Sequence, residues 1–273
     1  TPKPSSAASD VYKRQTSASA SPHRRDLRLR SRRRDRRLVP AFHPRRPRLT
    51  PLPLFFIFSL KEEWYPAFYW VARNIWAKLI LTGMGLIPKI EFSEPLIKGK
   101  NYMLTANHKS MIDVMLMLQI SKNPIVFVGK KELERLPVFG YFYRRVCIMV
   151  DRENSKSRAA VYGHAERRLK QGLSLCIFAE GLVTSPDIKL APFKNGVFRF
   201  SIHYQIPIVP MSFYDCERRY PYHFSYNYFV GGPGILRAKV HNHIETKGLS
   251  SENMESLKQK VYDFMLKDLE PML

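Results

Sequence analysis

The chain has 273 residues, 45% of them hydrophobic, and a formal net charge of +22. That length favours one large domain with appendages or two small domains, and the charge is typical of proteins that meet phosphate in nucleic acid, lipid headgroups or small substrates. The three cysteines are widely spaced without a CxxC pair, which argues against a zinc knuckle or a disulfide framework and favours buried core residues in a reducing compartment.

Residues 1–53 are rich in Ser, Pro and Arg, and residues 1–50 hold fifteen Lys and Arg against three Asp and Glu. Such a segment buries too little apolar surface to offset the entropy of ordering, so we expect it to be disordered. The Arg-rich run at 24–37 suits an arm for nucleic acid or anionic lipid, or a solvated tail without a selected role. Residues 9–15 resemble translated sequencing-adapter readthrough, which favours a tail that is not native protein.

Residues 54–88 are expected to form a membrane-associating helical segment. Apolar residues recur at helical spacing from Phe68 to Ile80, with polar residues on the opposite side, which predicts an amphipathic helix. Its apolar stretch is too short to span a bilayer, which takes roughly 20 residues. The aromatic content favours a helix lying along a membrane surface over one packed only on its own domain; the aromatic residues are Trp64, Tyr65, Phe68, Tyr69, Trp70 and Trp76.

In residues 89–273 predicted strands alternate with predicted helices. The strands are expected at 102–106, 125–128, 146–150, 173–178, 206–213 and 236–245, and the helices at 112–120, 155–171 and 193–204, followed by a terminal amphipathic helix capped by Ser251. This alternation predicts an α/β fold, a mostly parallel mixed sheet covered by helices. Ligands of such sheets bind beyond the carboxyl ends of the strands.

A histidine and a carboxylate follow the first of these strands. His108 and Asp113 are separated by four residues in the loop and first turns of the next helix, and Asn107 precedes them. A carboxylate on one ring nitrogen fixes the tautomer of the imidazole, and the other nitrogen is then free to take a proton from an alcohol. The pattern therefore predicts a general base, although the same residues also fit a helix cap with a surface Asp.

Other polar side chains are expected at the same edge of the sheet. Glu180 and Gly181 follow the strand at 173–178, where glycine permits a sharp turn of the backbone. The Glu180 carboxylate could accept hydrogen bonds from a polyol substrate, or it could simply be a residue of a surface turn. Lys131 and Arg152 follow two further strands and form a cationic rim suited to a phosphate or carboxylate.

His241 and His243 alternate on one predicted strand, but the sequence offers no third ligand for a metal. We therefore expect two solvent-facing histidines and no metal site.

These motifs occur in an order that resembles the 1-acyl-sn-glycerol-3-phosphate acyltransferase family, over roughly residues 64–273. The blocks that carry the resemblance are Asn107-His108-x4-Asp113, then Lys131-Glu132-Leu133 through Asp151-Arg152, Phe178-Ala179-Glu180-Gly181, Phe193-Lys194-Asn195-Gly196 and Ile206-Pro207-Ile208-Val209-Pro210. The sequence departs from the family pattern in two places: Ala179 replaces Pro, and Leu182-Val183 replaces Thr-Arg, which removes a phosphate-contacting arginine.

The resemblance implies that the free hydroxyl of a lysophosphatidic acid attacks the thioester of acyl-CoA or acyl-carrier protein, with His108 as base and Asp113 as its partner. Arg152 would contact the phosphate. Glu180 and Gly181 would shape the glycerol-phosphate pocket together with Asn107. One of the cations Lys131, Lys194 and Arg152 would compensate for the missing arginine. Because of that departure, another lysophospholipid or hydroxylated lipid stays open as the acceptor.

No metal and no organic cofactor is implied. The expected partners are the acyl donor, the lysophospholipid acceptor and a membrane surface, which places the protein on the cytoplasmic face of a membrane as a peripheral or monotopic enzyme. An alternative from another functional class is a protein that binds nucleic acid through the basic N-terminal arm, although nothing after residue 50 resembles a nucleic-acid-binding module. A third alternative is a lipid-binding member of the fold without catalytic activity.

Overall fold

The computed structural model describes residues 52–137, 139–151, 154–222 and 231–270. The chain divides into two units, residues 1–48 and 49–273. The predictions for the basic tail fall on residues outside the described part, except for positions 52 and 53.

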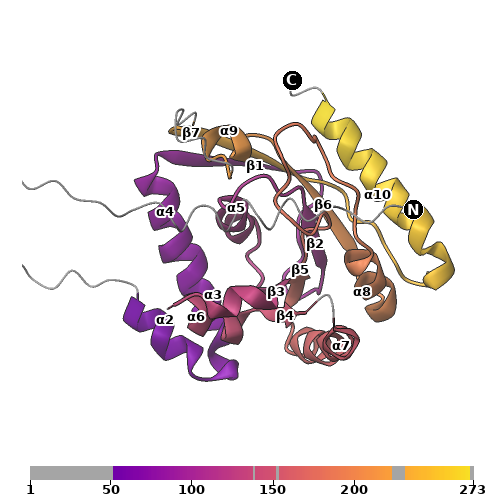
Figure 1. Cartoon of the computed structure of the whole chain (residues 1–273), viewed down its shortest axis with the longest axis horizontal. Helices are drawn as coiled ribbons and strands as arrows, with labels where there is room; N and C mark the ends of the chain where they lie inside the picture. Colours follow the sequence, from indigo (N-terminus) through magenta and orange to yellow (C-terminus); the bar gives the residue numbers. More distant parts are fainter. Residues whose placement is uncertain (1–51, 138, 152–153, 223–230, 271–273) are drawn as a thin grey trace, which may run out of the picture. The chain divides into compact units, whose positions relative to one another are not determined.

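A seven-stranded sheet forms the centre of the described part of the second unit (Figure 1). Neighbouring strands are parallel except β6 and β7, which are antiparallel. The predicted mostly parallel mixed sheet is therefore confirmed. In spatial order the strands are β1 (Leu86–Phe92), β7 (Gly234–Val240), β6 (Ile208–Phe213), β2 (Met103–Ala106), β5 (Ser174–Cys176), β3 (Ile125–Lys130) and β4 (Ile148–Val150).

Helices cover both faces of this sheet. α8 (Gly196–Tyr204) and α10 (Met254–Leu269) pack together against β6, whereas α4 (Ala77–Gly83) and α5 (Asp113–Ile120) pack together beside β1 (Figure 1). α7 (Ser155–Lys170) lies against β4 and β5. The remaining short helices are η3 (Lys131–Arg135), α6 (Phe139–Val146), α9 (Cys216–Arg219) and η4 (Ser251–Asn253).

The central strands are recognisable in the sequence because both of their faces are buried. Every residue of β2 and β6 is buried, and strands covered on both faces by helices read as nearly continuous apolar runs. β1 was not predicted, because Pro88, Lys89 and Glu91 interrupt its apolar residues. It lies at the edge of the sheet, where a proline costs no ladder hydrogen bond on the open side.

The helical segment before β1 packs on the domain through its tyrosines. The Tyr65 hydroxyl donates to the Ile125 carbonyl at 2.7 Å, and the Tyr69 hydroxyl donates to the Ser121 carbonyl at 2.8 Å. Three of the six aromatic residues assigned to a membrane surface are thus buried in the domain, namely Tyr65, Phe68 and Tyr69. The segment comprises α2 (Leu52–Ser59), η1 (Glu62–Trp64), α3 (Tyr65–Val71), the π-helical turn η2 (Ala72–Trp76) and α4.

Within the described ranges, no helix has both the length and the apolar composition to cross a membrane. Whether the segment lies on a membrane surface stays a prediction.

Two predicted boundaries need correction. The last strand ends at Val240 rather than 245, so His241 and His243 lie in the loop that follows β7. The capping serine is Ser250 rather than Ser251, and it caps η4, the short turn that leads into α10: the Ser250 hydroxyl accepts a hydrogen bond from the Glu252 N–H, and Asn253 completes a capping box.

Candidate active site

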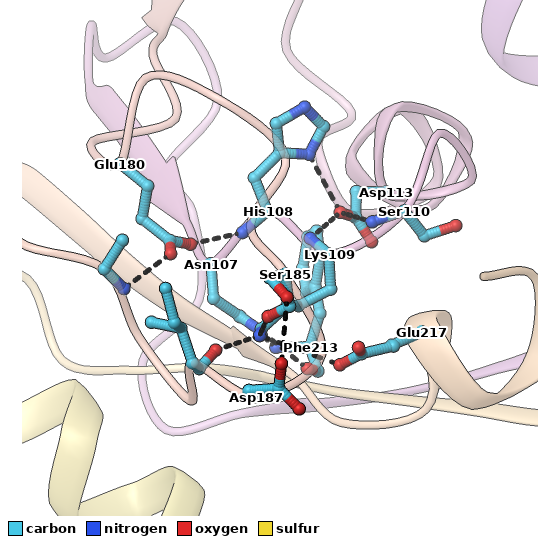
Figure 2. Close-up of polar contacts among 12 residues, drawn as sticks. Asn107, His108, Lys109, Ser110, Asp113, Glu180, Ser185, Asp187, Phe213 and Glu217 are labelled. Atoms are coloured by element: carbon cyan, nitrogen blue, oxygen red, sulfur yellow. Dashed lines mark hydrogen bonds and ion pairs between the residues drawn. The ribbon is translucent and has the colours of Figure 1, made fainter. Parts of the chain in front are cut away.

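The candidate site lies where β2, β5 and β6 end. The chain leaves β2 at Ala106 and runs through residues 107–112 into α5, while the loops after β5 and β6 close around it (Figure 2). Because β2 is parallel to both neighbours, their carboxyl ends meet at one edge of the sheet. The edge is the one at which ligands of parallel α/β sheets bind.

His108 and Asp113 form a hydrogen-bonded pair in this loop. The Nδ1 atom of His108 lies 2.9 Å from Oδ2 of Asp113, and Figure 2 shows the second ring nitrogen pointing away from the carboxylate. The histidine side chain is 15% exposed, whereas the aspartate side chain is fully buried. The pair thus leaves one imidazole nitrogen open to a reacting group.

Backbone groups hold the Asp113 carboxylate in place. Oδ2 accepts hydrogen bonds from the N–H groups of Lys109 at 2.8 Å and Ser110 at 2.9 Å, in addition to the histidine. The loop therefore curls around the first turn of α5, which is the geometry that the four-residue spacing predicted. Burial and the neighbouring Asp113 carboxylate raise the pKa of the Cys216 thiol at the start of α9, so that thiol stays protonated beside the pair.

The imidazole of His108 is also held by an aromatic ring. Its ring stacks on Phe178 with the centroids 4.1 Å apart and the planes 13° from parallel. Phe178 belongs to the loop after β5, so the motif from that loop orients the imidazole of the first motif. The stacking restricts rotation of the imidazole without occupying either nitrogen.

Glu180 links two loops instead of standing free at the edge. Oε1 accepts a hydrogen bond from the His108 N–H at 2.6 Å, and Oε2 accepts one from the Ala191 N–H at 2.7 Å. Only 1% of the residue is exposed. Burial raises the pKa of Glu180 above its ordinary value, while the two N–H donors and the charges of Lys109 and His108 act in the opposite direction.

Gly181 and Leu182 continue from this buried carboxylate towards solvent. Gly181 has a φ of 76°, which confirms the predicted sharp turn. Any other residue at this position would have a strained backbone. Leu182 is 56% exposed. The residue that departs from the family pattern is thus an apolar side chain on the surface beside the site.

Asn107 joins the loop to the last residue of β6. Its Nδ2 donates to the Phe213 carbonyl at 2.9 Å, and its Oδ1 accepts from the Phe213 N–H at 2.8 Å. Both ends of the carboxamide are therefore used within the protein. These contacts favour a role in positioning His108 over direct contact with a substrate.

Lys109 was not singled out in the sequence, yet it connects three parts of the site. The buried Nζ donates to the carbonyl oxygens of Ser185, at 3.1 Å, and Ile188, and it lies 3.7 Å from the Glu217 carboxylate on α9 (Figure 2). The sequence offers one indication of this role, namely that Lys109 follows His108 directly. Its burial could not be predicted, because a lysine in a polar loop usually lies in solvent.

The predicted cationic rim is described only in part. Lys131 opens η3 at the end of β3 and is exposed. Lys194 is exposed as well, and its backbone N–H donates to the Ala179 carbonyl at 2.8 Å, next to Glu180. Arg152 lies outside the described residues.

The prediction that His241 and His243 face solvent is wrong. Their side chains are 2% and 3% exposed. The Nε2 atom of His241 lies 2.8 Å from the Ser212 hydroxyl and 3.4 Å from Asp268, whereas His243 lies 3.1 Å from Glu94. Each histidine thus has its own carboxylate neighbour, and no group of three or more His, Cys, Asp or Glu that could hold a metal occurs in the part of the chain that the structure describes.

Known proteins match the chain over the same region. Residues 87–214 match the acyltransferase family model. An uncharacterized acyltransferase of Schizosaccharomyces pombe is 30% identical, over 62% of this chain and 60% of its own length. The 1-acyl-sn-glycerol-3-phosphate acyltransferase of Saccharomyces cerevisiae is 25% identical, over 73% of this chain and 65% of its own length.

Among solved structures, the 1-acyl-sn-glycerophosphate (LPA) acyltransferase PlsC from Thermotoga maritima has the same fold. The TM-score is 0.63 at 24% identity, covering 81% of this chain and 87% of that one. The chain spans less than two thirds of the length of the two fungal relatives. Residues 87–214 thus match the acyltransferase family model, and the chain shares the fold of PlsC.

Proposed function

We propose that the protein transfers a fatty acyl group from a thioester donor to the free hydroxyl of 1-acyl-glycerol-3-phosphate and so makes phosphatidic acid. The observation that carries this proposal is the hydrogen bond between His108 and the buried Asp113, with the second imidazole nitrogen left open at the edge of the sheet. The name of the Saccharomyces cerevisiae relative supports the choice of substrate.

The chemistry follows from the two ring nitrogens. Asp113 accepts the Nδ1 proton of His108, so Nε2 carries the lone pair that removes the proton of the acceptor hydroxyl. The hydroxyl oxygen then attacks the thioester carbonyl, the carbon–sulfur bond breaks, and the imidazolium returns the proton to the departing thiolate. The reaction as proposed draws on the donor thioester and needs no metal or organic cofactor.

The test is acyl transfer by a His108→Ala variant. The controls are wild-type protein and a Lys189→Ala variant, which changes an exposed side chain in the loop after β5. Loss of the base should lower kcat by about 10²- to 10⁴-fold, while the circular dichroism spectrum and the unfolding midpoint stay close to those of the wild type. Full activity in a correctly folded His108→Ala protein would refute the proposal.

The acceptor is a second question, because Leu182 and Val183 stand where the family has Thr-Arg and Leu182 is exposed beside the site. A panel of lysolipid acceptors with different headgroups decides it: a clear preference for 1-acyl-glycerol-3-phosphate supports phosphatidic acid as product. A preference for a neutral or zwitterionic headgroup instead favours another lysophospholipid or hydroxylated lipid as acceptor.

We also propose that the protein works on the cytoplasmic face of a membrane as a peripheral or monotopic enzyme. Its acceptor is an amphiphile that resides in a bilayer, and large apolar side chains are exposed on the segment from α2 to α4, including Trp70 at 58% and Leu79 at 57%. Exposed aromatic and aliphatic side chains of this kind suit insertion at the level of lipid headgroups.

A further inference from the structure

Lys109 is a buried lysine that the acyl transfer proposed above does not use. Its side chain is 8% exposed, whereas lysines are almost never buried unless they are paired. Withdrawing an ammonium group from water costs free energy that only hydrogen-bonded or charged partners offset. The partners of this ammonium therefore indicate which contacts its burial maintains.

The partners of the Lys109 ammonium lie on a turn of the loop after β5 and on α9. Nζ donates to the carbonyl oxygens of Ser185, at 3.1 Å, and Ile188. The Ile188 N–H donates to the same Ser185 carbonyl at 3.1 Å, so the two carbonyls belong to one tight turn. The Glu217 carboxylate lies 3.7 Å from the ammonium. The lysine thus holds this turn against α9 and against the loop that carries His108.

The turn belongs to residues 182–188, a segment that borders the candidate site. The Thr184 N–H donates to the His108 carbonyl at 3.1 Å, so the segment is bonded directly to the residue that carries the open imidazole nitrogen. Figure 2 shows the Lys109 side chain extending away from the imidazole and towards Glu217. The lysine therefore contacts the segment from the side opposite to the reacting group.

The segment has little packing of its own. Among residues 182–188, all of which the structure describes, only Thr184 is buried. Leu182 and Ile188 are 56% and 46% exposed. A loop that buries so little apolar surface opens readily unless polar contacts hold it. The ammonium of Lys109 supplies two of those contacts in the middle of the segment.

We propose that Lys109 is a positioning residue whose ammonium clamps residues 182–188 beside His108, so that Leu182 and Ile188 form a fixed wall for the lipid acceptor. The proposal rests on the acyl transfer proposed above and deepens it. The acceptor is the substrate concerned, because its hydroxyl must reach the imidazole of the residue to which the segment is bonded. Two exposed apolar side chains suit the apolar part of an amphiphile. Lys109 itself touches none of the reacting atoms.

The first experiment measures the mobility of the segment without catalysis. Amide hydrogen exchange of the full chain is followed by mass spectrometry in the wild type, Lys109→Met and the control Lys100→Met. Lys100 pairs with Glu245 at 3.2 Å and precedes β2, at the opposite end of that strand from His108.

We expect the amides of residues 182–188 to exchange about tenfold faster in Lys109→Met, as for loss of a charged hydrogen bond, while β2 and β6 exchange as in the wild type. The control should match the wild type in the segment. Unchanged exchange of the segment in Lys109→Met overturns the proposal, and so does exchange that is equally faster across the whole sheet, because the lysine would then stabilise the fold in general.

The second experiment asks which kinetic constant depends on the clamp. Lys109→Met should raise KM for the lysolipid acceptor about tenfold, while kcat and KM for the thioester donor stay within about twofold of the wild type. Lys109→Arg retains a donating cation and should recover part of the exchange protection and of the acceptor KM. An arginine variant no better than the methionine variant overturns the role of the charge.

Two further outcomes overturn the proposal. One is a lower kcat of Lys109→Met with an unchanged acceptor KM, which would place the effect on His108 instead of on the wall. The other is a raised acceptor KM without faster exchange of residues 182–188, which would mean that the ammonium contacts the acceptor directly. If the wild type transfers no acyl group, the proposed function fails while the exchange experiment still decides the clamp.

Discussion

The two acidic residues of the motifs do different work in the site. Asp113 binds the imidazole of His108 directly, whereas Glu180 binds only backbone N–H groups, from His108 and Ala191. One carboxylate therefore binds the imidazole, and the other fixes the loop that carries it. The protein holds a single imidazole from three sides: by Asp113, by the ring of Phe178 and, through its backbone, by Glu180.

The role of Asp113 can be tested with an isosteric amide. Asp113→Asn keeps an oxygen that accepts from the N–H groups of Lys109 and Ser110, but a neutral amide cannot stabilise the imidazolium that forms on His108. We expect kcat to fall by about 10²- to 10⁴-fold with little change in KM, measured by steady-state acyl transfer. An unchanged unfolding midpoint is the control, and a kcat near that of the wild type would contradict this role.

The role of Glu180 is testable through the pH dependence of stability. Burial raises its pKa in the folded protein, so the folded state keeps a proton that the unfolded chain loses. The contribution of this group to the free energy of unfolding is therefore largest below its ordinary pKa, about 4.3, and falls as the pH rises through the raised value. The difference between wild type and Glu180→Gln, from urea unfolding, should decrease as the pH is raised to neutrality; a constant difference would count against a raised pKa.

The sequence predicted the residues of the site better than their contacts. His108 and Asp113 were found because their spacing at a strand end has a simple geometric consequence. The contacts of Lys109 and Glu180 depend on carbonyl and N–H groups of residues 185–191, which approach them only through the tertiary fold. His241 and His243 were placed in solvent for the same reason, because their neighbours Asp268 and Glu94 are distant in the chain.

At the level of elements, η3 and α6 form a hairpin that depends on a glycine. The Gly140 N–H donates to the Leu136 carbonyl at 2.7 Å, and a Cβ added at Gly140 would lie 1.9 Å from the Glu134 carbonyl oxygen. The backbones of the two helices therefore approach too closely for any side chain at this position.

Gly140→Ala should accordingly lower the free energy of unfolding by about 1–3 kcal/mol, measured by urea unfolding. The matched control is Gly163→Ala in α7, where an added Cβ meets nothing within 4 Å. That change should raise the free energy of unfolding by about 0.5–1 kcal/mol, because alanine favours the helix over glycine. Equal effects of the two substitutions would show that the close approach at Gly140 relaxes freely.

The elements themselves differ in how far the sequence predicts them. β2 and β6 are apolar runs buried on both sides, and α5, α7 and α8 have helical patterns of ordinary length. β1 combines apolar with charged residues because it is an edge strand, and its partner β7 lies more than 140 residues away. α6 was not predicted because it is short, although its aromatic and arginine residues are amphipathic at helical spacing.

For the molecule as a whole, the apolar side chains of the N-terminal helices fall into two groups, one buried and one exposed. Tyr65, Phe68 and Tyr69 are buried against the domain. Other large apolar residues from α2 to α4 are 38–58% exposed, although soluble proteins rarely expose extensive contiguous apolar surface. These exposed residues are Leu54, Phe56, Ile57, Leu60, Trp64, Trp70, Trp76 and Leu79.

If these exposed residues bind a bilayer, polar substitutions among them should release the protein without unfolding it. Trp70→Ser and Leu79→Ser together should weaken binding to phospholipid vesicles by about tenfold or more, since each side chain contributes about 1.5–3 kcal/mol when fully buried in an apolar environment. The control is Ile97→Ser, which removes an apolar side chain that is 56% exposed between β1 and β2. Cosedimentation with vesicles measures the effect, and acyl transfer to a detergent-dispersed acceptor should survive in all variants. Equal vesicle binding by the double variant and the control would mean that the exposed apolar residues from α2 to α4 contact something other than lipid.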